Sequence, residues 1–148
     1  MHIPAFSLAS PLQVGPVRFA NRVILAPMSG ITDRPFRSLA VRHGAGMVVS
    51  EMIAGGELGR GRSESGRRLE AVPGIAHMVQ LAGREPATMA EAARIAEGEG
   101  ADIVDLNMGC PAKKVIGGAA GAALMREPDR AIAIVAAVVA AVKVPVTV

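Results

Sequence analysis

The chain has 148 residues, enough for one compact domain, and 51% of them are hydrophobic, which excludes an intrinsically disordered protein. Three Phe, no Tyr and no Trp are too few rings for an aromatic platform that stacks single-stranded nucleic acid. The net charge is +3. Residues 14–42 contain five arginines, at positions 18, 22, 34, 37 and 42, and a single acid, Asp33. This stretch is either a basic front for a polyanion or an ordinary solvated face.

Short β-branched runs alternate with helix-length amphipathic runs along the chain. The predicted strands, in chain order, are residues 12–14, 17–19, 23–26, 47–50, 77–81, 102–107 and 145–148. The first two flank Gly15-Pro16 and predict a small hairpin, and Pro27 ends the first core strand.

Three helices are predicted between these strands. Thr32 or Asp33 caps the first, which has Pro35 in its first turn and Gly44 after its end. The second runs from Glu85-Pro86 to Gly98 or Gly100, and the third from Pro128 to Val142. Residues 51–73, rich in Gly and Arg, carry no clear pattern.

This alternation predicts a parallel sheet, either doubly wound or closed as a TIM barrel. A doubly wound sheet favours a Gly-rich phosphate turn after its first strand, but that loop reads Ala26-Pro-Met-Ser-Gly. The sequence also stops inside its last strand. We therefore expect an α/β fold, the first half of a TIM (β/α)8 barrel with about four βα units and the start of strand 5.

Cys110 is the one cysteine, so the chain forms no internal disulfide and is expected to be cytoplasmic. Residues 1–10 lack the charged and apolar regions of a signal peptide. The apolar run 131–142 is too short to span a membrane and predicts a buried helix. No His, Cys and acid cluster has metal-ligand spacing, so no metal is expected.

Functional loops of parallel α/β folds follow the carboxyl ends of the strands, and polar residues stand at these junctions. Gln80 lies in an otherwise apolar strand and Asn107 ends another, so both need partners if buried. Cys110 lies between Gly109 and Pro111 in such a loop. It is either an inert small hydrophobe or a thiol that donates a proton as readily as its thiolate attacks.

Four segments resemble the bacterial tRNA-dihydrouridine synthases in order and spacing. They are Leu25-Ala-Pro-Met-Ser-Gly-Ile-Thr-Asp-Arg-Pro-Phe-Arg37, Ser50-Glu-Met, Val79-Gln-Leu-Ala-Gly83 and Asp105-Leu-Asn-Met-Gly-Cys-Pro-Ala-Lys-Lys-Val115. Any one of these motifs alone can occur by chance, and the Ala-Pro-Met turn also occurs in other flavin barrels. All four together are specific, and the Asn-Met-Gly-Cys-Pro run is the most distinctive.

The resemblance implies a role for each matching position. Pro27, Met28 and Ser29 would form the backbone bed of an FMN ring, and Gln80 would hydrogen-bond that ring. Asn107 would hold the uracil, and Cys110 would be the catalytic acid. In the family's chemistry NADPH reduces FMN, a hydride passes to C6 of uracil in tRNA, and the thiol protonates C5.

The resemblance also implies that the remaining barrel and a helical tRNA-binding domain are absent from residues 1–148. A full-length enzyme is expected to be a monomer, and these 148 residues alone are expected to self-associate and to be inactive. Two alternatives are another FMN-dependent TIM-barrel oxidoreductase acting on a small pyrimidine, and a non-catalytic half-barrel. The roles of Lys113, Lys114, Glu51 and Arg34 stay open.

Overall fold

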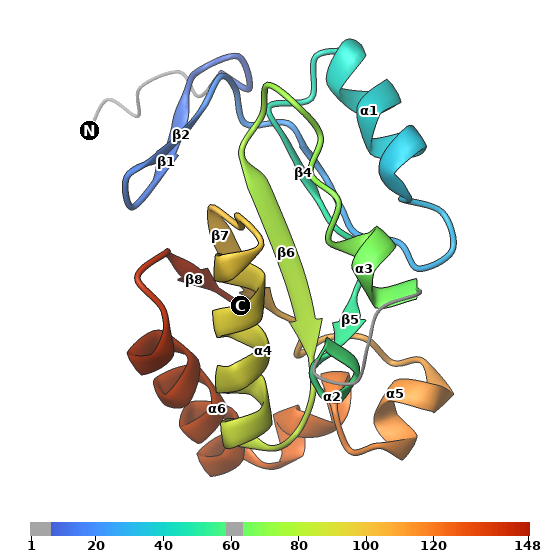
Figure 1. The fold of residues 1–148 in the computed structure, drawn as a ribbon, viewed down its shortest axis with the longest axis vertical. Helices are drawn as coiled ribbons and strands as arrows, with labels where there is room; N and C mark the ends of the chain where they lie inside the picture. The colour runs from blue at the N-terminus through green and yellow to red at the C-terminus, as the bar shows by residue number, and fades with distance from the viewer. Residues whose placement is uncertain (1–6, 59–63) are drawn as a thin grey trace, which may run out of the picture.

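The computed structural model describes residues 7–58 and 64–148, and its main feature is a parallel sheet (Figure 1). The strands are β3 (Ile24–Leu25), β4 (Met47–Val49), β5 (Ile53–Ala54), β6 (His77–Ala82), β7 (Ile103–Leu106) and β8 (Val146–Thr147). Their order across the sheet is β3, β4, β6, β7, β8, which is also their order along the chain. In a doubly wound sheet the order reverses about the first strand, so this order is that of a barrel wall and the barrel expectation is confirmed.

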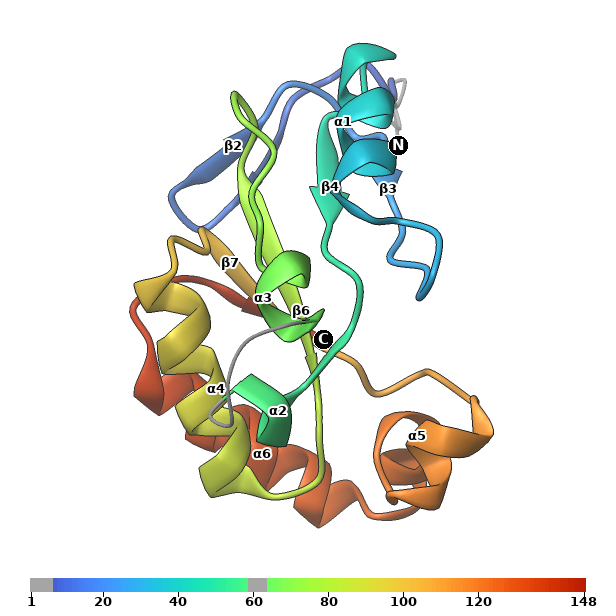
Figure 2. The same cartoon turned by 45° about the vertical axis from the view of Figure 1, so that its right-hand side comes forward.

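Three helices follow the core strands and cover one face of the sheet. They are α1 (Arg34–Arg42), α4 (Pro86–Gly98) and α6 (Pro128–Ala141). α4 and α6 lie side by side in both ribbon views (Figures 1 and 2). The buried alanines of α4 allow it to pack closely against both α6 and the sheet, because their side chains are small. Alternate residues of β6 and β7, among them Val79 and Val104, complete this outer core.

The opposite, inner face of the sheet is closed at the amino ends of the strands by a hairpin. Strands β1 (Leu12–Val14) and β2 (Val17–Phe19) pair antiparallel, which confirms the predicted hairpin, and Gly15 takes the positive φ of +56° in the turn. Phe19, 2% exposed, packs with Met47, Val49, Met78 and Ile103. The amino end of the inner face is therefore apolar, and polar side chains can gather only toward the carboxyl ends.

The first helix begins as the sequence predicts. Asp33 is its N-cap, because its carboxylate accepts a hydrogen bond from the Phe36 N–H at 2.9 Å. Thr32 instead lies buried in the preceding turn. Gly44 follows the helix with a φ of +92°, the left-handed conformation that glycine adopts most readily.

The segment without a sequence prediction, 51–73, contains β5 and the short helices α2 (Gly55–Leu58) and α3 (Glu64–Arg68), with residues 59–63 outside the described part. Both β4 and β5 pair with β6, but Val49 is opposite Met78 whereas Ile53 is opposite Leu81. One extra residue is therefore inserted between the two strands, as in a β-bulge. After the bulge, β5 continues beside β6 toward the carboxyl end of the sheet.

Arginine side chains tie this segment to α1 and join its two parts. Arg34 Nε donates to the Ala71 carbonyl at 3.2 Å, Arg37 donates to the Glu70 carbonyl at 3.0 Å, and Arg68 donates to the Met52 carbonyl at 3.0 Å. Arg37 is only 1% exposed. Neither sequence interpretation of the arginine stretch, a basic front or a solvated face, therefore applies to Arg37, which is a buried anchor.

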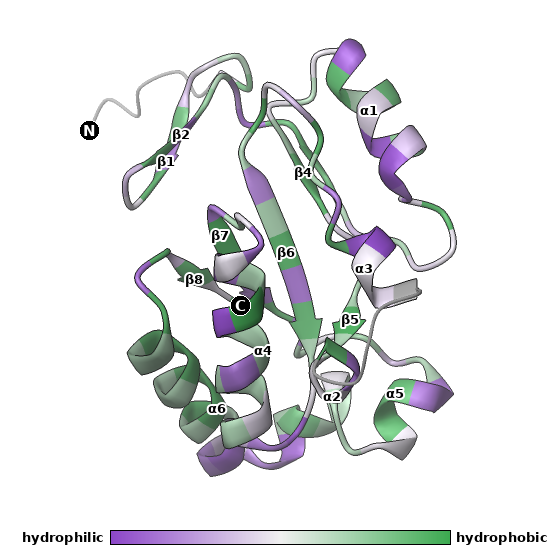
Figure 3. Ribbon diagram, in the orientation of Figure 1, coloured by the Kyte–Doolittle hydropathy of each residue, from purple (hydrophilic) through white to green (hydrophobic). Residues whose placement is uncertain are grey.

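Two expectations about helices need correction. The loop after β7 contains α5 (Lys113–Gly117) and a 3₁₀ helix η1 (Gly121–Arg126), neither of which was predicted. The helix expected to be buried, α6, buries only one face: Ile134 and Val138 are 0% exposed, but Ile132 is 66% exposed. The reason is that α6 lies in the outer layer, although Figure 3 shows apolar residues along most of its length.

Among the residues described, no helix has the length and apolar character that crossing a membrane requires. The segment considered for a signal peptide includes residues 1–6, which lie outside the described ranges.

His77, the first residue of β6, gives the fold a pH dependence that can be measured. The side chain is 5% exposed, and its Nε2 atom is buried without a hydrogen-bond partner in the described structure. Burial lowers the pKa of His77 below its ordinary value of 6.5, and a hydrogen bond with the Leu69 backbone opposes this only in part. The folded chain therefore keeps His77 neutral where an unfolded chain would bind a proton.

We predict that the free energy of unfolding falls as the pH drops below about 6.5, because only the unfolded state gains the His77 proton until the lower folded pKa is reached. Urea unfolding of the wild type and of His77→Leu at several pH values between about 7.5 and 5.5 measures this. The Leu variant should show the flatter dependence. Parallel curves for wild type and His77→Leu would contradict the prediction.

Candidate active site

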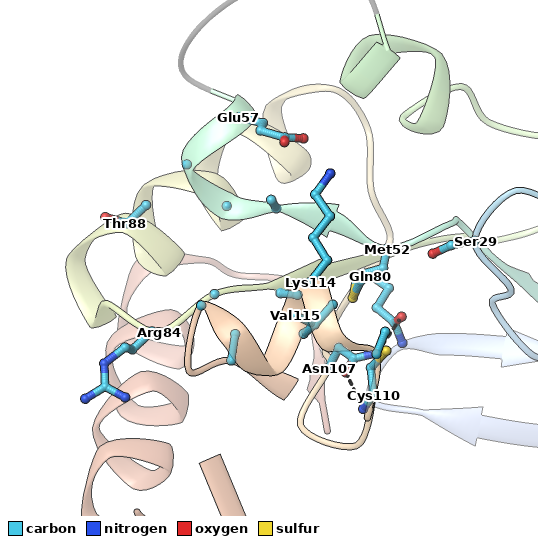
Figure 4. Close-up of a pocket in the computed structure, with 18 of the residues that line it drawn as sticks. Ser29, Met52, Glu57, Gln80, Arg84, Thr88, Asn107, Cys110, Lys114 and Val115 are labelled. Carbon is cyan, nitrogen blue, oxygen red and sulfur yellow. Dashed lines mark hydrogen bonds between the residues drawn. The ribbon is translucent and has the colours of Figure 1, made fainter. Parts of the chain in front are cut away.

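A cavity of about 870 Å³ opens at the carboxyl ends of the strands, between β5, β6 and the loops after β3 and β7 (Figure 4). Small residues form much of its wall, which lets a flat ligand approach the backbone. These are Pro27, Ala54, Gly55, Gly56, Ala82 and Gly83. Its volume lies within the range of sites for small molecules and cofactors.

Five of the six residues singled out in the sequence line this cavity: Pro27, Ser29, Gln80, Asn107 and Cys110. They come from three separate parts of the chain, and the parallel sheet brings them together because its strands all end at one edge. Figure 4 shows Gln80, Asn107 and Cys110 grouped at one end of the cavity, with Ser29 beyond them.

Met28 is the exception, because it does not line the cavity and its side chain is 39% exposed. Its backbone is occupied within the turn: the N–H donates to Thr32 Oγ1 at 2.8 Å, and the carbonyl accepts from Thr32 Oγ1 at 3.1 Å. The buried Thr32 hydroxyl therefore fixes the turn that presents Pro27 and Ser29.

Glu51, whose role the sequence left open, holds the same turn from the β4 side. It is 8% exposed, and its Oε1 atom accepts a hydrogen bond of 2.5 Å from the Gly30 N–H. Ser50 next to it accepts a hydrogen bond from the Gln80 N–H at 3.0 Å and donates to the Glu51 carbonyl. These bonds fix the loops after β3 and β4 relative to β6.

A row of polar side chains crosses the inner face of β6, β7 and β8. Gln80 is opposite Asp105 in the register, and Asp105 is opposite Thr147. Gln80 Nε2 donates to Asp105 Oδ2 at 2.7 Å, and Thr147 Oγ1 donates to Asp105 Oδ1 at 2.5 Å. Asn107 Nδ2 donates to Gln80 Oε1 at 3.0 Å. Gln80 and Asn107 thus find the partners that their burial requires.

Asp105 is a site residue for which the sequence analysis assigned no role. The signal was available, because an acid in the apolar run Ile103-Val-Asp-Leu is as unusual as Gln80 in its own strand. Asp105 is the first residue of the motif that contains Asn107 and Cys110, and only those two later residues were assigned roles.

Cys110 lies on a loop that is held at both of its backbone polar groups. Its N–H donates to Asn107 Oδ1 at 3.0 Å, and its carbonyl accepts from the Ala122 N–H at 3.0 Å. The side chain is partly buried. No histidine of the described residues lines the cavity, so the geometry offers Cys110 no imidazole base.

The cavity is also lined by charged side chains that the sequence did not single out as a group, namely Glu57, Arg68, Arg84 and Lys114. Figure 4 shows Glu57 and Arg84 away from Cys110. Lys114 lines the cavity, but Lys113 does not. Arg84 pairs with Glu127 through two hydrogen bonds of 2.6 and 3.0 Å, which tie the loop after β6 to the start of α6. This pairing lowers the pKa of the Glu127 carboxyl below its ordinary range.

Across residues 7–58 and 64–148, no three His, Cys, Asp or Glu side chains gather closely enough to hold a metal ion.

A family model described as dihydrouridine synthase (Dus) matches residues 24–148. A probable tRNA-dihydrouridine synthase of Rhizobium leguminosarum bv. phaseoli is 63% identical over 127 residues, which cover 86% of this chain and 40% of that protein. A tRNA-dihydrouridine synthase B of Xanthomonas campestris pv. campestris is 50% identical over 137 residues, covering 92% of this chain and 41% of that protein. The chain therefore spans about two fifths of the length of these relatives.

Solved structures share the fold at low sequence identity. A variant of NCR from Zymomonas mobilis superposes with a TM-score of 0.64 at 22% identity, covering 97% of this chain and 58% of its own. A histamine dehydrogenase from Rhizobium sp. 4-9 gives a TM-score of 0.60 at 14% identity, covering 90% of this chain and 32% of its own. Both agree with the barrel wall described above.

Gly121 tests how closely η1 must approach the Cys110 loop. A Cβ at this position would lie 2.6 Å from the Cys110 carbonyl oxygen and 2.7 Å from Val115 Cγ1, and the φ of Gly121 is +58°. We predict that Gly121→Ala lowers the free energy of unfolding by about 1–3 kcal/mol, because it combines a left-handed backbone with a clash against another backbone atom.

Denaturant unfolding measures this change, with Gly117→Ala as the matched control. A Cβ on Gly117 meets nothing within 4 Å and its φ is not in the left-handed region, so this variant should unfold within about 0.5 kcal/mol of the wild type. Equal stability of the two variants would mean that η1 shifts freely and does not hold the Cys110 loop.

Proposed function

We propose that this chain, which belongs to the dihydrouridine synthase family, is part of a protein that reduces the C5–C6 double bond of uracil in tRNA to 5,6-dihydrouridine. The bound cofactor is FMN, the reductant is NADPH, and the reaction takes place in the cytoplasm. The observation that carries the proposal is the grouping of Gln80, Asn107 and Cys110 in one cavity at the carboxyl ends of the strands. Because the chain spans about two fifths of its relatives, residues 1–148 form the amino-terminal part of the catalytic barrel in this proposal.

The cavity fits a flavin ring on three observations. Its wall of Pro27, Ala82 and Gly83 leaves room for a flat ring against the backbone. Gln80 offers an amide whose remaining N–H can bond to a ring carbonyl or nitrogen. The volume of about 870 Å³ accommodates a tricyclic ring together with a pyrimidine. When bound and reduced, FMN would supply the hydride for C6 of uracil.

The protein's own residues would orient the uracil and supply the proton. Asn107 would hold the ring, and the Cys110 thiol would transfer its proton to C5, leaving a thiolate that takes up a proton from solvent. The backbone bonds of Cys110 to Asn107 and Ala122 support this role, since a proton donor acts only when it is held at the reacting atom. The uridine must leave its stack to enter the cavity.

The first test of this proposal is Cys110→Ala in the protein at its full natural length. Without the acid, uridine reduction should fall by about 10²- to 10⁴-fold, whereas the rate of flavin reduction by NADPH should stay unchanged. Stopped-flow absorbance follows the flavin, and single-turnover assays of dihydrouridine follow the tRNA. Dihydrouridine formation at the wild-type rate would remove Cys110 from the acid role. A wild-type protein that never binds flavin would favour the non-catalytic alternative.

A second test concerns Gln80. We predict that Gln80→Leu weakens FMN binding by an amount typical of one buried hydrogen bond, about 1–3 kcal/mol, or about 5- to 150-fold in Kd. Titration of the apo-protein with FMN measures it. Gln13→Leu is the control, because Gln13 bonds to the Gly15 carbonyl in the hairpin at the opposite end of the strands. Equal affinity of the Gln80 variant and the wild type would refute the assignment.

A further inference from the structure

Asp105 occupies the centre of the polar row, on the strand that leads directly into the Cys110 loop. Its two carboxylate oxygens accept hydrogen bonds from opposite neighbours, Gln80 on β6 and Thr147 on β8. Asp105 does not line the cavity, so it lies behind the residues that do. Its influence on a ligand must therefore pass through other side chains.

Both oxygens of Asp105 accept hydrogen bonds at one end of this chain, and backbone N–H groups donate at its other end, so the two ends together set the direction of the bonds between them. Gln80 must turn its NH₂ group toward Asp105, so its Oε1 atom faces Asn107. Asn107 must then turn its NH₂ group toward Gln80, so its Oδ1 atom faces the backbone of the next loop. There it accepts from the Cys110 N–H at 3.0 Å and the Gly109 N–H at 3.3 Å.

We propose that Asp105 is a positioning residue that fixes the amide orientations of Gln80 and Asn107 and, through Asn107, the backbone of Cys110. The inference deepens the proposed function and rests on it for its catalytic consequence. Without the carboxylate the Gln80 NH₂ group loses its acceptor, and only the Gly109 and Cys110 N–H groups at the other end still orient Asn107. The chain of hydrogen bonds that holds the Cys110 N–H then lacks one member, and both amides are held less firmly.

The same orientation decides what Asn107 offers to a ligand. Its oxygen already accepts two backbone hydrogen bonds, so the polar atom left for the cavity is the second N–H of its NH₂ group. Asn107 therefore presents a donor, which matches a carbonyl oxygen of a ring such as uracil. With the amide rotated, it would present an acceptor and repel that carbonyl.

The test compares Asp105→Leu with Asp105→Asn in the protein at its full natural length. Leucine cannot accept a hydrogen bond. Asparagine can accept from Gln80 with its oxygen, while its NH₂ group donates to the Thr147 hydroxyl, which can turn to accept. Asp102→Leu is the control, because Asp102 lies just before the same strand and accepts a hydrogen bond from the His77 N–H at the far end.

Amide hydrogen exchange, read by mass spectrometry, is the first readout. Asp105→Leu should speed exchange of the Gly109 and Cys110 amides about fivefold or more relative to the β6 and β7 amides, since one hydrogen bond is lost. Asp105→Asn should restore the wild-type rate, and Asp102→Leu should leave the loop unchanged relative to the strands. No acceleration in Asp105→Leu, or equal acceleration throughout the sheet, would overturn the proposal.

Uridine reduction is the second readout and separates the two proposals. In single turnover, Asp105→Leu should lose about tenfold or more in rate and Asp105→Asn should recover most of it. A wild type that reduces tRNA together with a fully active Asp105→Leu overturns the positioning role. A wild type that reduces no uridine overturns the proposed function alone, and the exchange rates then decide the role of Asp105.

Discussion

Side chains along β6 and β7 point alternately to the two faces of the sheet, and this two-residue period sorts polar from apolar groups. Val79 and Leu81 face the helices, and Gln80 between them faces the inside of the sheet. On β7, Val104 and Leu106 face outward and Asp105 faces inward. A slip of one residue would bury the polar groups against α4 and α6 and expose the apolar ones. The burial of the helices thus selects the register that assembles the cavity.

A second constraint is the cost of burying the Arg37 guanidinium. Burial removes the guanidinium from water and lowers the pKa of Arg37, and the charge of Glu51 opposes this more than any other charge does. The carbonyls of Thr32 and Glu70 accept two of its hydrogen bonds. A buried guanidinium is costly unless hydrogen-bond partners compensate for the lost water. Because one of these partners is the Glu70 carbonyl, Arg37 ties α1 to the segment after α3. Glu51 joins this anchor to the turn at Gly30 in the cavity wall.

The sequence predicted the features that follow from local patterns. The β-branched runs located the core strands, and Asp33 and Gly44 marked the ends of α1. Gln80 and Asn107 stood out because polar residues in apolar strands need partners. The strand β5 was not predicted, because two residues are too few to show an alternation of apolar and polar side chains. Its place also depends on a bulge that is defined only by pairing with β6. The burial of Arg37 was not predicted, because one of its two carbonyl acceptors, that of Glu70, lies 33 positions away in the sequence.

The loop of Cys110 shows how the barrel wall and its connections act together on one side chain. From the strand side, Asn107 accepts the Cys110 N–H; from the other side, η1 donates the Ala122 N–H to the Cys110 carbonyl. Gly121 allows η1 this approach, and Ala119 before it holds a φ of +52°, a strained conformation for a residue with a side chain. A surface loop left to itself would sample many conformations. Fixing both ends of the Cys110 peptide unit therefore leaves the thiol little freedom beyond its own χ1 rotation. The proposed acid role of Cys110 requires this restriction, because a proton donor must be held at one carbon of its substrate.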